Sequence, residues 1–224
     1  MKRGNPALRP VAGLARILSP ALAPATLALT ILALAFAAPA RADGGAPAGG
    51  PPQMSPEEMQ KMMALMQPGP NHAVLGRLAG KWKTKISLWM GPGDPQATEG
   101  TATYEWNLGG RYLIDHQTGS FAGMPYEGMG IEGYDNGKKE FFGVWIDNMG
   151  TGVMHLTGQA DADGQGWTLA GPVFEPSQGR DIMVREAIRF DGPDRYTFSM
   201  FSTGTTPDGK AAEKKVMEIS ATRM

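Results

Sequence analysis

The sequence predicts a closed antiparallel β-barrel of about ten strands, mainly β in class and preceded by two short helices. Ten strand-like segments follow one another from residue 81 to residue 223, joined by short turns with no helical segment between them. Parallel strands need long crossover connections, so the short turns indicate an antiparallel, up-and-down sheet. A sheet of this length avoids exposed edges most easily by closing into a barrel, and ten strands leave room for a cavity.

The strand assignments depend on alternation and on turn residues. In the first segment, Trp82 and Ile86 alternate with lysines, which indicates one buried face. The clearest turn is Tyr134-Asp135-Asn136-Gly137, because Asn-Gly accepts the positive φ angle that tight hairpin turns require. We expect strands at residues 81–88, 98–108, 111–120, 128–134, 140–146, 151–160, 167–173, 182–190, 196–200 and 213–223.

Residues 1–42 have the features of a secretory signal peptide. Basic residues precede an apolar stretch at 27–38, and Ala40-Arg41-Ala42 satisfies the small-x-small rule for cleavage after Ala42. An uncleaved anchor is the alternative, since residues 21–40 are long enough to span a bilayer. Pro24 and the small-residue ending favour cleavage. We therefore expect an exported protein, periplasmic or secreted, that is not inserted in the membrane after cleavage.

Charge and cysteine content exclude several classes of function. The signal segment holds five of the 21 Lys and Arg residues and no acid, which leaves 16 basic and 22 acidic residues. A net charge of −6 gives no electrostatic basis for binding nucleic acid or anionic lipid. The absence of cysteine excludes a disulfide framework and thiolate chemistry.

The segment between the signal and the barrel divides into a linker and a helical part. Residues 43–54 are rich in Gly, Pro and Ala and are expected to be a disordered linker. Residues 55–79 are expected to form two helices. Ser55-Pro56-Glu57-Glu58 is a strong start for the first helix, which should run to Met66, and Asn71 can cap a second over residues 72–79.

The first helix carries a row of methionines at helical spacing. Soft thioether sulfur suits Cu(I), but no His or Cys lies nearby to support a copper site. The alternative is that these flexible side chains pack the helix against the mouth of the barrel. The methionines are Met59, Met62, Met63 and Met66.

Residues at the two ends of the barrel segment, 80–224, resemble the calycin arrangement of lipocalins and fatty-acid-binding proteins. In that arrangement the Trp of a Gly-x-Trp closes one barrel end and a late Arg lies across its ring; Gly80-Lys81-Trp82 and Arg223 match these positions. Arg223 shares a strand face with Ile219 and Ala221, so its guanidinium should point inward, where an indole face can hold it.

Further segments over residues 68–224 are similar to the DUF1579 family of bacterial proteins. The resemblance implies a calycin-like barrel of unassigned biochemical function, and it carries over no catalytic residue. The segments are Pro70–His72, Leu108–Leu113, Gly133–Lys138, Trp145–Asp147 and Val216–Ile219.

Aromatic and charged residues that could line the barrel give a candidate ligand site. Glu186 is in phase with Val184 and Ile188 on a buried face, and an unpaired buried carboxylate is costly. Its partner is expected to be Arg111, His116 or a ligand group, so a structural ion pair and a ligand contact are both open. The candidate residues are Trp82, Tyr104, Trp106, Arg111, His116, Trp145, Glu186 and Arg223.

His116 raises the question of a cofactor. It lies on the Tyr112 and Ile114 side of its strand, which places it toward the cavity. An inward histidine could ligate haem, as in the nitrobindin relatives of this fold class, whose haem histidine lies late in the chain. No histidine follows His155 here, and the three histidines lack metal-ligand spacing, so we expect neither haem nor another metal.

These observations favour a binding protein for a small apolar or amphipathic molecule held against barrel aromatics. No nucleophile motif supports catalysis. The alternatives are an enzyme that acts on a lipid-like substrate through Glu186, a haem- or metal-binding protein, and an assembly module that docks a partner on the methionine helix.

Overall fold

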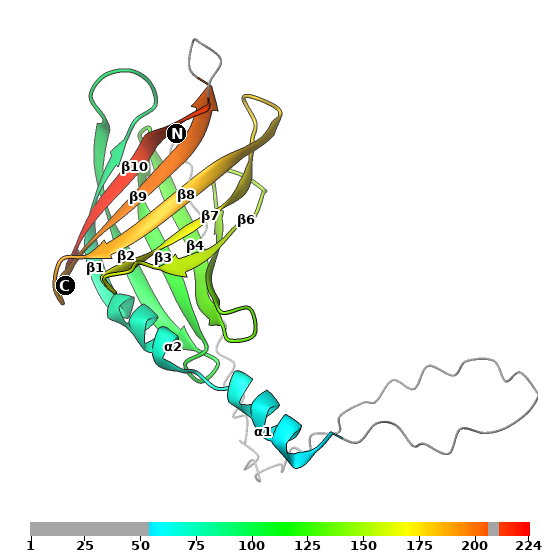
Figure 1. The fold of residues 1–224 in the computed structure, drawn as a ribbon. Coiled ribbons are helices and arrows are strands. Elements are labelled where there is room, and N and C mark those ends of the chain that lie inside the picture. The colour runs from blue at the N-terminus through cyan, green and yellow to red at the C-terminus, as the bar shows by residue number, and fades with distance from the viewer. Residues whose placement is uncertain (1–53, 206–210) are drawn as a thin grey trace, which may run out of the picture. The chain divides into compact units, whose positions relative to one another are not determined.

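The computed structural model describes residues 54–205 and 211–224, which form the predicted barrel and the two α-helices before it (Figure 1). The helical elements are α1 (Pro56–Leu65), α2 (Pro70–Leu75) and the 3₁₀ turn η1 (Gly76–Leu78). The strands are β1 (Gly80–Leu88), β2 (Gln96–Asn107), β3 (Tyr112–Phe121), β4 (Met124–Asp135), β5 (Glu140–Asp147), β6 (Met154–Ala160), β7 (Gly166–Glu175), β8 (Arg180–Phe190), β9 (Arg195–Thr205) and β10 (Ala211–Arg223). The expected signal peptide and the expected linker up to residue 53 lie outside the described residues.

Each strand pairs with its neighbours in sequence, and β1 pairs with β10 to close the barrel. All pairs are antiparallel, as the short turns predict. The closing seam runs from Trp82 opposite Arg223 to Leu88 opposite Met217. Alternate residues of each strand therefore face the interior, and the register decides which side chains meet there.

The turn between β4 and β5 differs from the tight Asn-Gly turn that the sequence predicts. Residues 136–139 form a four-residue loop, closed by a 2.7 Å hydrogen bond from the Lys139 N–H to the Asp135 carbonyl. Asp135 Oδ1 accepts two further N–H groups of the loop, at 2.8 and 2.9 Å. The positive φ angle falls on Lys139, at 60°, and on neither Asn136 nor Gly137. Because the Asp135 carboxylate satisfies the loop amides, the wider turn is stable.

One end of the barrel is closed by α2 and η1. Leu75 and Leu78 are fully buried and join the core inside this closed end. The indole Nε1 of Trp82 donates a 2.7 Å hydrogen bond to the Leu78 carbonyl. The Arg223 guanidinium lies 4.1 Å from the centre of the Trp82 ring, as the calycin-like arrangement predicts.

Aromatic side chains fill the interior next to the closed end. Phe141 and Trp167 are stacked, with ring centres 5.7 Å apart, and Trp167 also contacts Phe190. Tyr196 meets the Trp82 ring edge-on at 4.8 Å. These contacts make a solid core in one part of the barrel, so a cavity can exist only further from α2.

Helix α1 begins with the predicted cap, since the Glu58 N–H donates to Ser55 Oγ at 3.2 Å and the Glu58 carboxylate accepts the Ser55 N–H at 2.7 Å. None of its residues is buried. The methionine row is exposed, so the expectation that it packs against the barrel mouth is wrong. The exposed methionines are Met59, Met62, Met63 and Met66.

Side chains of the barrel hold the C-terminal end of α1. Asn136 Nδ2 donates hydrogen bonds to the carbonyls of Leu65 and Gln67, at 2.9 and 2.8 Å. Arg111 Nε donates to the Met66 carbonyl at 3.1 Å. Three carbonyls at the end of the helix and just after it are thereby satisfied.

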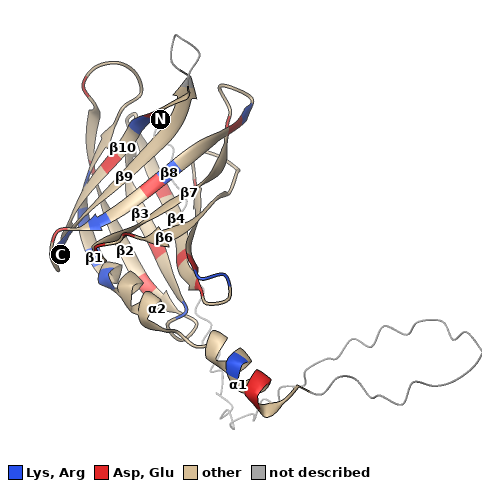
Figure 2. Ribbon diagram, in the orientation of Figure 1, with Lys and Arg blue, Asp and Glu red and all other residues tan. Residues whose placement is uncertain are grey.

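Charged residues are distributed over several strands and helix α1 rather than gathered in one segment (Figure 2). Among residues 54–205 and 211–224, no helix is long and apolar enough to cross a membrane.

Candidate functional site

A cavity of about 230 Å³ lies in the barrel beyond the aromatic core. It is smaller than the 300–1,000 Å³ typical of pockets for drug-sized ligands, so it has room only for a small molecule. One lining residue, Met149, is in the loop that joins β5 and β6 and is 43% exposed. Its apolar walls include Ile86, Leu88, Leu169, Ile188, Phe198, Met200, Met217 and Ile219.

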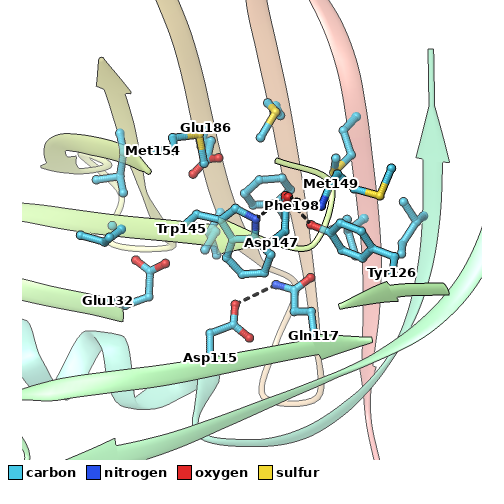
Figure 3. A pocket seen from close by; sticks show the side chains of 18 of the residues that line it. Asp115, Gln117, Tyr126, Glu132, Trp145, Asp147, Met149, Met154, Glu186 and Phe198 are labelled. Carbon is cyan, nitrogen blue, oxygen red and sulfur yellow. Dashed lines mark hydrogen bonds between the residues drawn. The ribbon is translucent and has the colours of Figure 1, made fainter. Parts of the chain in front are cut away.

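Three carboxyl groups project into this cavity (Figure 3). Asp115 comes from β3 and Glu132 from the adjacent β4, whereas Glu186 comes from β8, well separated from both in the strand order. Asp115 is opposite Gly130 in the register and Glu132 is opposite Gly143, so neither carboxyl meets a neighbouring side chain on β4 or β5 at its own level. We refer to Asp115, Glu132 and Glu186 as the acid trio.

Asp115 is the most enclosed of the three, with only 2% of its surface exposed. Its Oδ2 accepts a 2.7 Å hydrogen bond from Gln117 Nε2, while its Oδ1 is buried and has no hydrogen-bond partner among the described residues. Burial disfavours the charged form and raises the pKa of Asp115 to about 7, against the smaller opposing effects of the Gln117 hydrogen bond and of the nearby Tyr104 hydroxyl.

Glu132 lies over Gly143, where a Cβ atom would stand 3.1 Å from Glu132 Oε2. This oxygen is buried and also lacks a hydrogen-bond partner among the described residues. Burial raises the pKa of Glu132 well above its ordinary value, and the charges of Glu186 and Asp115 raise it further. Burial, with a smaller effect of Asp115, raises the pKa of Glu186 to about 8. Glu132 and Glu186 therefore retain their protons near neutral pH, whereas Asp115 is close to its titration midpoint.

No described Lys, Arg or His side chain lines the cavity. The expected ion pair of Glu186 with Arg111 or His116 is wrong, because neither side chain enters the barrel. Arg111 donates hydrogen bonds to the Met66 and Leu108 carbonyls at the closed end. His116 is exposed on the outer face of β3. No cation of the described chain is thus placed to pair with a member of the trio when that carboxyl ionises.

A fourth carboxyl group in the wall, that of Asp147, is fully partnered. Its Oδ2 accepts the indole N–H of Trp145 at 3.1 Å and the hydroxyl of Tyr126 at 3.3 Å, and its Oδ1 accepts the Met149 N–H at 2.9 Å (Figure 3). All four carboxyl groups line the same cavity, but in the described chain only Asp147 has protein hydrogen-bond donors for both of its oxygens.

Two tyrosines connect the cavity to the closed end. The hydroxyls of Tyr104 and Tyr196 are 3.1 Å apart, and Tyr104 lines the cavity while Tyr196 packs on Trp82. Burial raises the pKa of both phenols, so both stay protonated. This pair forms a polar floor between the aromatic core and the acid trio.

Comparison with known proteins places the chain in a family. The family described as "Protein of unknown function (DUF1579)" matches residues 67–223. The chain belongs to the DUF1579 family. No curated protein matches the DUF1579 chain. Among solved structures, Rv2717c from M. tuberculosis aligns with a TM-score of 0.52 and 14% identity, over 70% of this chain and 99% of that one. This similarity shows the fold alone. A redesigned beta barrel aligns over 67% of this chain and 95% of that one, at 16% identity and a TM-score of 0.34.

The DUF1579 barrel places three of the eight candidate residues in the cavity lining: Tyr104, Trp145 and Glu186. Trp82 and Arg223 are at the closed end, where they contact each other. The other three lie elsewhere. Trp106 is 37% exposed and packs near Gly76, while Arg111 and His116 are in the positions described above.

Asp115 and Glu132 were not predicted as site residues, and for Asp115 the reason is that the inward face of β3 was misassigned. Tyr112 and Ile114 suggest a buried face, yet they face outward with His116, and Leu113, Asp115 and Gln117 face inward. Apolar residues occur on both faces of this DUF1579 strand, so alternation alone did not identify the interior. Leu113 is fully buried and marks the inward face of β3.

The alternatives that involve cofactors remain predictions for the DUF1579 protein. The haem site considered at His116 would require an inward histidine, and no histidine lines the cavity of the described chain. The methionines considered for Cu(I) are on α1, outside the barrel. In the described ranges, no group of three or more His, Cys, Asp or Glu side chains has the arrangement of a metal site.

Proposed function

We propose that the barrel binds a small amphipathic molecule, with its apolar part against the cavity walls and one polar group at the acid trio. The observation that carries the proposal is the cavity itself, which combines apolar walls with carboxyl oxygens that lack partners. Burial of apolar ligand surface contributes roughly 25 cal/mol per Å², and a few polar groups fix orientation.

Wall residues allow a matched test of this proposal. Met200 lines the cavity from β9, whereas Met183 is on β8 with its side chain exposed on the outside. Met200→Trp should fill part of the cavity, and Met183→Trp adds the same bulk without entering it. Native mass spectrometry of protein purified from its own host should detect a small molecule with the wild type and with Met183→Trp, and less with Met200→Trp.

Two results would contradict the proposal. One is a wild-type barrel that is repeatedly free of bound molecules from its own host. The other is a bound molecule retained equally by the Met200→Trp variant, since that molecule would lie outside the cavity.

An enzyme acting on a lipid-like substrate in the same cavity is the second candidate. The observation that favours it is the position of Asp115, whose pKa of about 7 suits a general acid or base near neutral pH. A substrate screen should then show turnover that Asp115→Asn abolishes without loss of fold. Turnover that survives in a folded Asp115→Asn protein would remove Asp115 from the reaction.

We also propose that the protein is exported, on the basis of the signal-like residues 1–42. Cell fractionation followed by N-terminal sequencing should find the mature protein outside the cytoplasm, beginning at Asp43. A full-length chain in the cytoplasm would contradict export.

A further inference from the structure

We propose that the ligand is a small organic cation, an amine with one apolar arm, whose ammonium group binds between Asp115, Glu132 and Glu186. This inference rests on the proposed function and names the chemistry of its ligand. It follows from the unpartnered oxygens, the absence of a protein cation in the described lining, and the arrangement of polar and apolar surface in the cavity.

The unpartnered oxygens show what the site lacks. Asp115 Oδ1 and Glu132 Oε2 are buried without a hydrogen bond, and native proteins rarely leave such atoms unpaired. Both belong to residues that line one cavity. A ligand that donates hydrogen bonds would satisfy them, and a primary ammonium carries three N–H donors.

The charge of the site favours a cation over a neutral donor. Three carboxyl groups share the cavity, and the described chain supplies no Lys, Arg or His to it. Opposite charge strengthens hydrogen bonds in a site of low dielectric constant. Carboxyls of the trio repel one another once they ionise, and a single bound cation would lower that repulsion. A neutral alcohol would satisfy one or two oxygens and leave that repulsion unchanged.

The walls define the rest of the molecule. Beyond the trio, the lining is largely apolar up to the exposed Met149, with Phe198 and Met200 on one wall. Asp147 already has three protein donors, so it is not available to a second ammonium group. The geometry therefore suits one charged end and one apolar arm, rather than a diamine.

Protonation links this binding to pH. The other titratable groups in the lining are Tyr104 on β2, Tyr126 on β4 and Asp147 on β5; β1, β6, β7, β9 and β10 contribute none to the lining. Burial raises the pKa of both tyrosines, so they stay protonated while the trio titrates. A bound ammonium favours ionised carboxyls, so binding should release protons and strengthen as the pH rises toward 9.

The experiment compares n-hexylamine with hexanol, which has the same apolar arm and no charge, by titration calorimetry on the folded protein at pH 6 to 9. We expect hexylamine to bind at least about tenfold more tightly at pH 8, with an advantage that grows with pH. Measurement in two buffers of different ionisation enthalpy should show proton release on binding of the amine. The wild type alone gives this result, so no variant needs to fold for the test.

Variants then locate the cation. Asp115→Asn and Glu186→Gln each remove one charge at nearly constant shape and should reduce the preference for hexylamine severalfold. Glu105→Gln removes an exposed charge from β2 outside the cavity and should leave the preference unchanged.

Two outcomes would overturn the inference. Equal binding of hexanol and hexylamine would show that charge is not recognised, although a cavity ligand would still be supported. Binding that weakens as the pH rises would indicate a ligand that accepts hydrogen bonds from protonated acids. Neither outcome affects the native mass spectrometry result, so failure of this inference and failure of the proposed function are distinguishable.

Discussion

The indole ring of Trp145 lies across the inner face of Gly128, in the space that a side chain at that position would occupy. A Cβ atom at Gly130 would also stand 3.1 Å from the ring, at Trp145 Cε3. Two glycines on β4 therefore allow a large aromatic side chain on β5 to lie flat against the barrel wall. In this position the indole N–H reaches Asp147.

This relationship predicts that Gly128→Ala is costly. The added methyl group would overlap the ring and force Trp145 toward the cavity, and overpacking of this kind costs about 1–3 kcal/mol. Urea denaturation should show the loss. Gly152→Ala is the control, since a Cβ atom there meets nothing within 4 Å. Equal stability of Gly128→Ala and the wild type would contradict the reported position of Trp145.

The contact between Arg223 and Trp82 predicts a large effect at the closed end. Arg223 donates hydrogen bonds to the Ala79 and Arg77 carbonyls, at 2.8 and 2.9 Å, while its guanidinium covers the indole. Arg223→Ala should lower the free energy of unfolding by about 2–4 kcal/mol, since charged hydrogen bonds and a cation–π contact are lost. Arg223→Lys should recover only part of this free energy, because an ammonium group cannot reproduce the planar set of N–H donors of a guanidinium. Arg195→Ala, at an exposed position on β9, should change the free energy of unfolding in urea little. An equal effect of the two alanine variants would refute the prediction.

The acid trio predicts that the ligand-free protein loses stability as the pH rises. Glu186 has an ordinary pKa of 4.5 and a folded-state pKa of about 8, so between these values the folded chain holds a proton that the unfolded chain has released. The contribution of this group is complete below pH 4.5 and is lost by about pH 8, with a slope of about 1.4 kcal/mol per pH unit. Asp115 acts in the same direction between its ordinary value of 3.8 and about 7.

Denaturation series from pH 4.5 to 8.5 should therefore show a falling free energy of unfolding. Glu186→Gln should have a shallower slope than the wild type because one titrating group is absent. An identical slope in the two proteins would mean that Glu186 titrates normally.

The hydrogen bonds from Asn136 predict a local effect on helix α1. Asn136→Ala removes two donors from the Leu65 and Gln67 carbonyls and leaves the barrel interior intact. Hydrogen exchange in residues 57–67 should become faster, while the free energy of unfolding from urea denaturation changes by less than about 1 kcal/mol. Asn148→Ala is the matched control, because Asn148 also donates a side-chain hydrogen bond to a carbonyl, that of Pro125, between strands rather than to α1. Unchanged exchange in Asn136→Ala would show that α1 is held by other contacts.

Much of the fold could be predicted from local chemistry. Short turns and alternating residues identify the antiparallel meander, and the resemblance to the calycin arrangement, supported by the inward phase of Arg223, predicts its contact with Trp82. The turn at Asn136 is the exception. Its dipeptide predicts a tight turn, but the Asp135 side chain satisfies a wider loop. Side-chain hydrogen bonds of this kind depend on geometry that residue type does not specify.

The acid trio was only partly predictable. Glu186 is on a strand whose apolar residues share one face, so its inward position follows from alternation. Glu132 is on a strand whose inward positions include Gly128 and Gly130, and glycine gives no hydrophobic signal. Which acids meet depends on barrel closure and on the stagger between strands, and neither is a property of any single segment.

The seam between β1 and β10 also has a kinetic consequence. All the other strand pairings join neighbours in the chain, so they can form as successive hairpins at low entropic cost. The seam alone must bring residue 82 to residue 223, and until it forms, two long edges are exposed and the acids of β3, β4 and β8 have no common interior. Pairing of β1 with β10 is therefore the step that creates the enclosed cavity. Aggregation through the two exposed edges competes with folding until that step is complete.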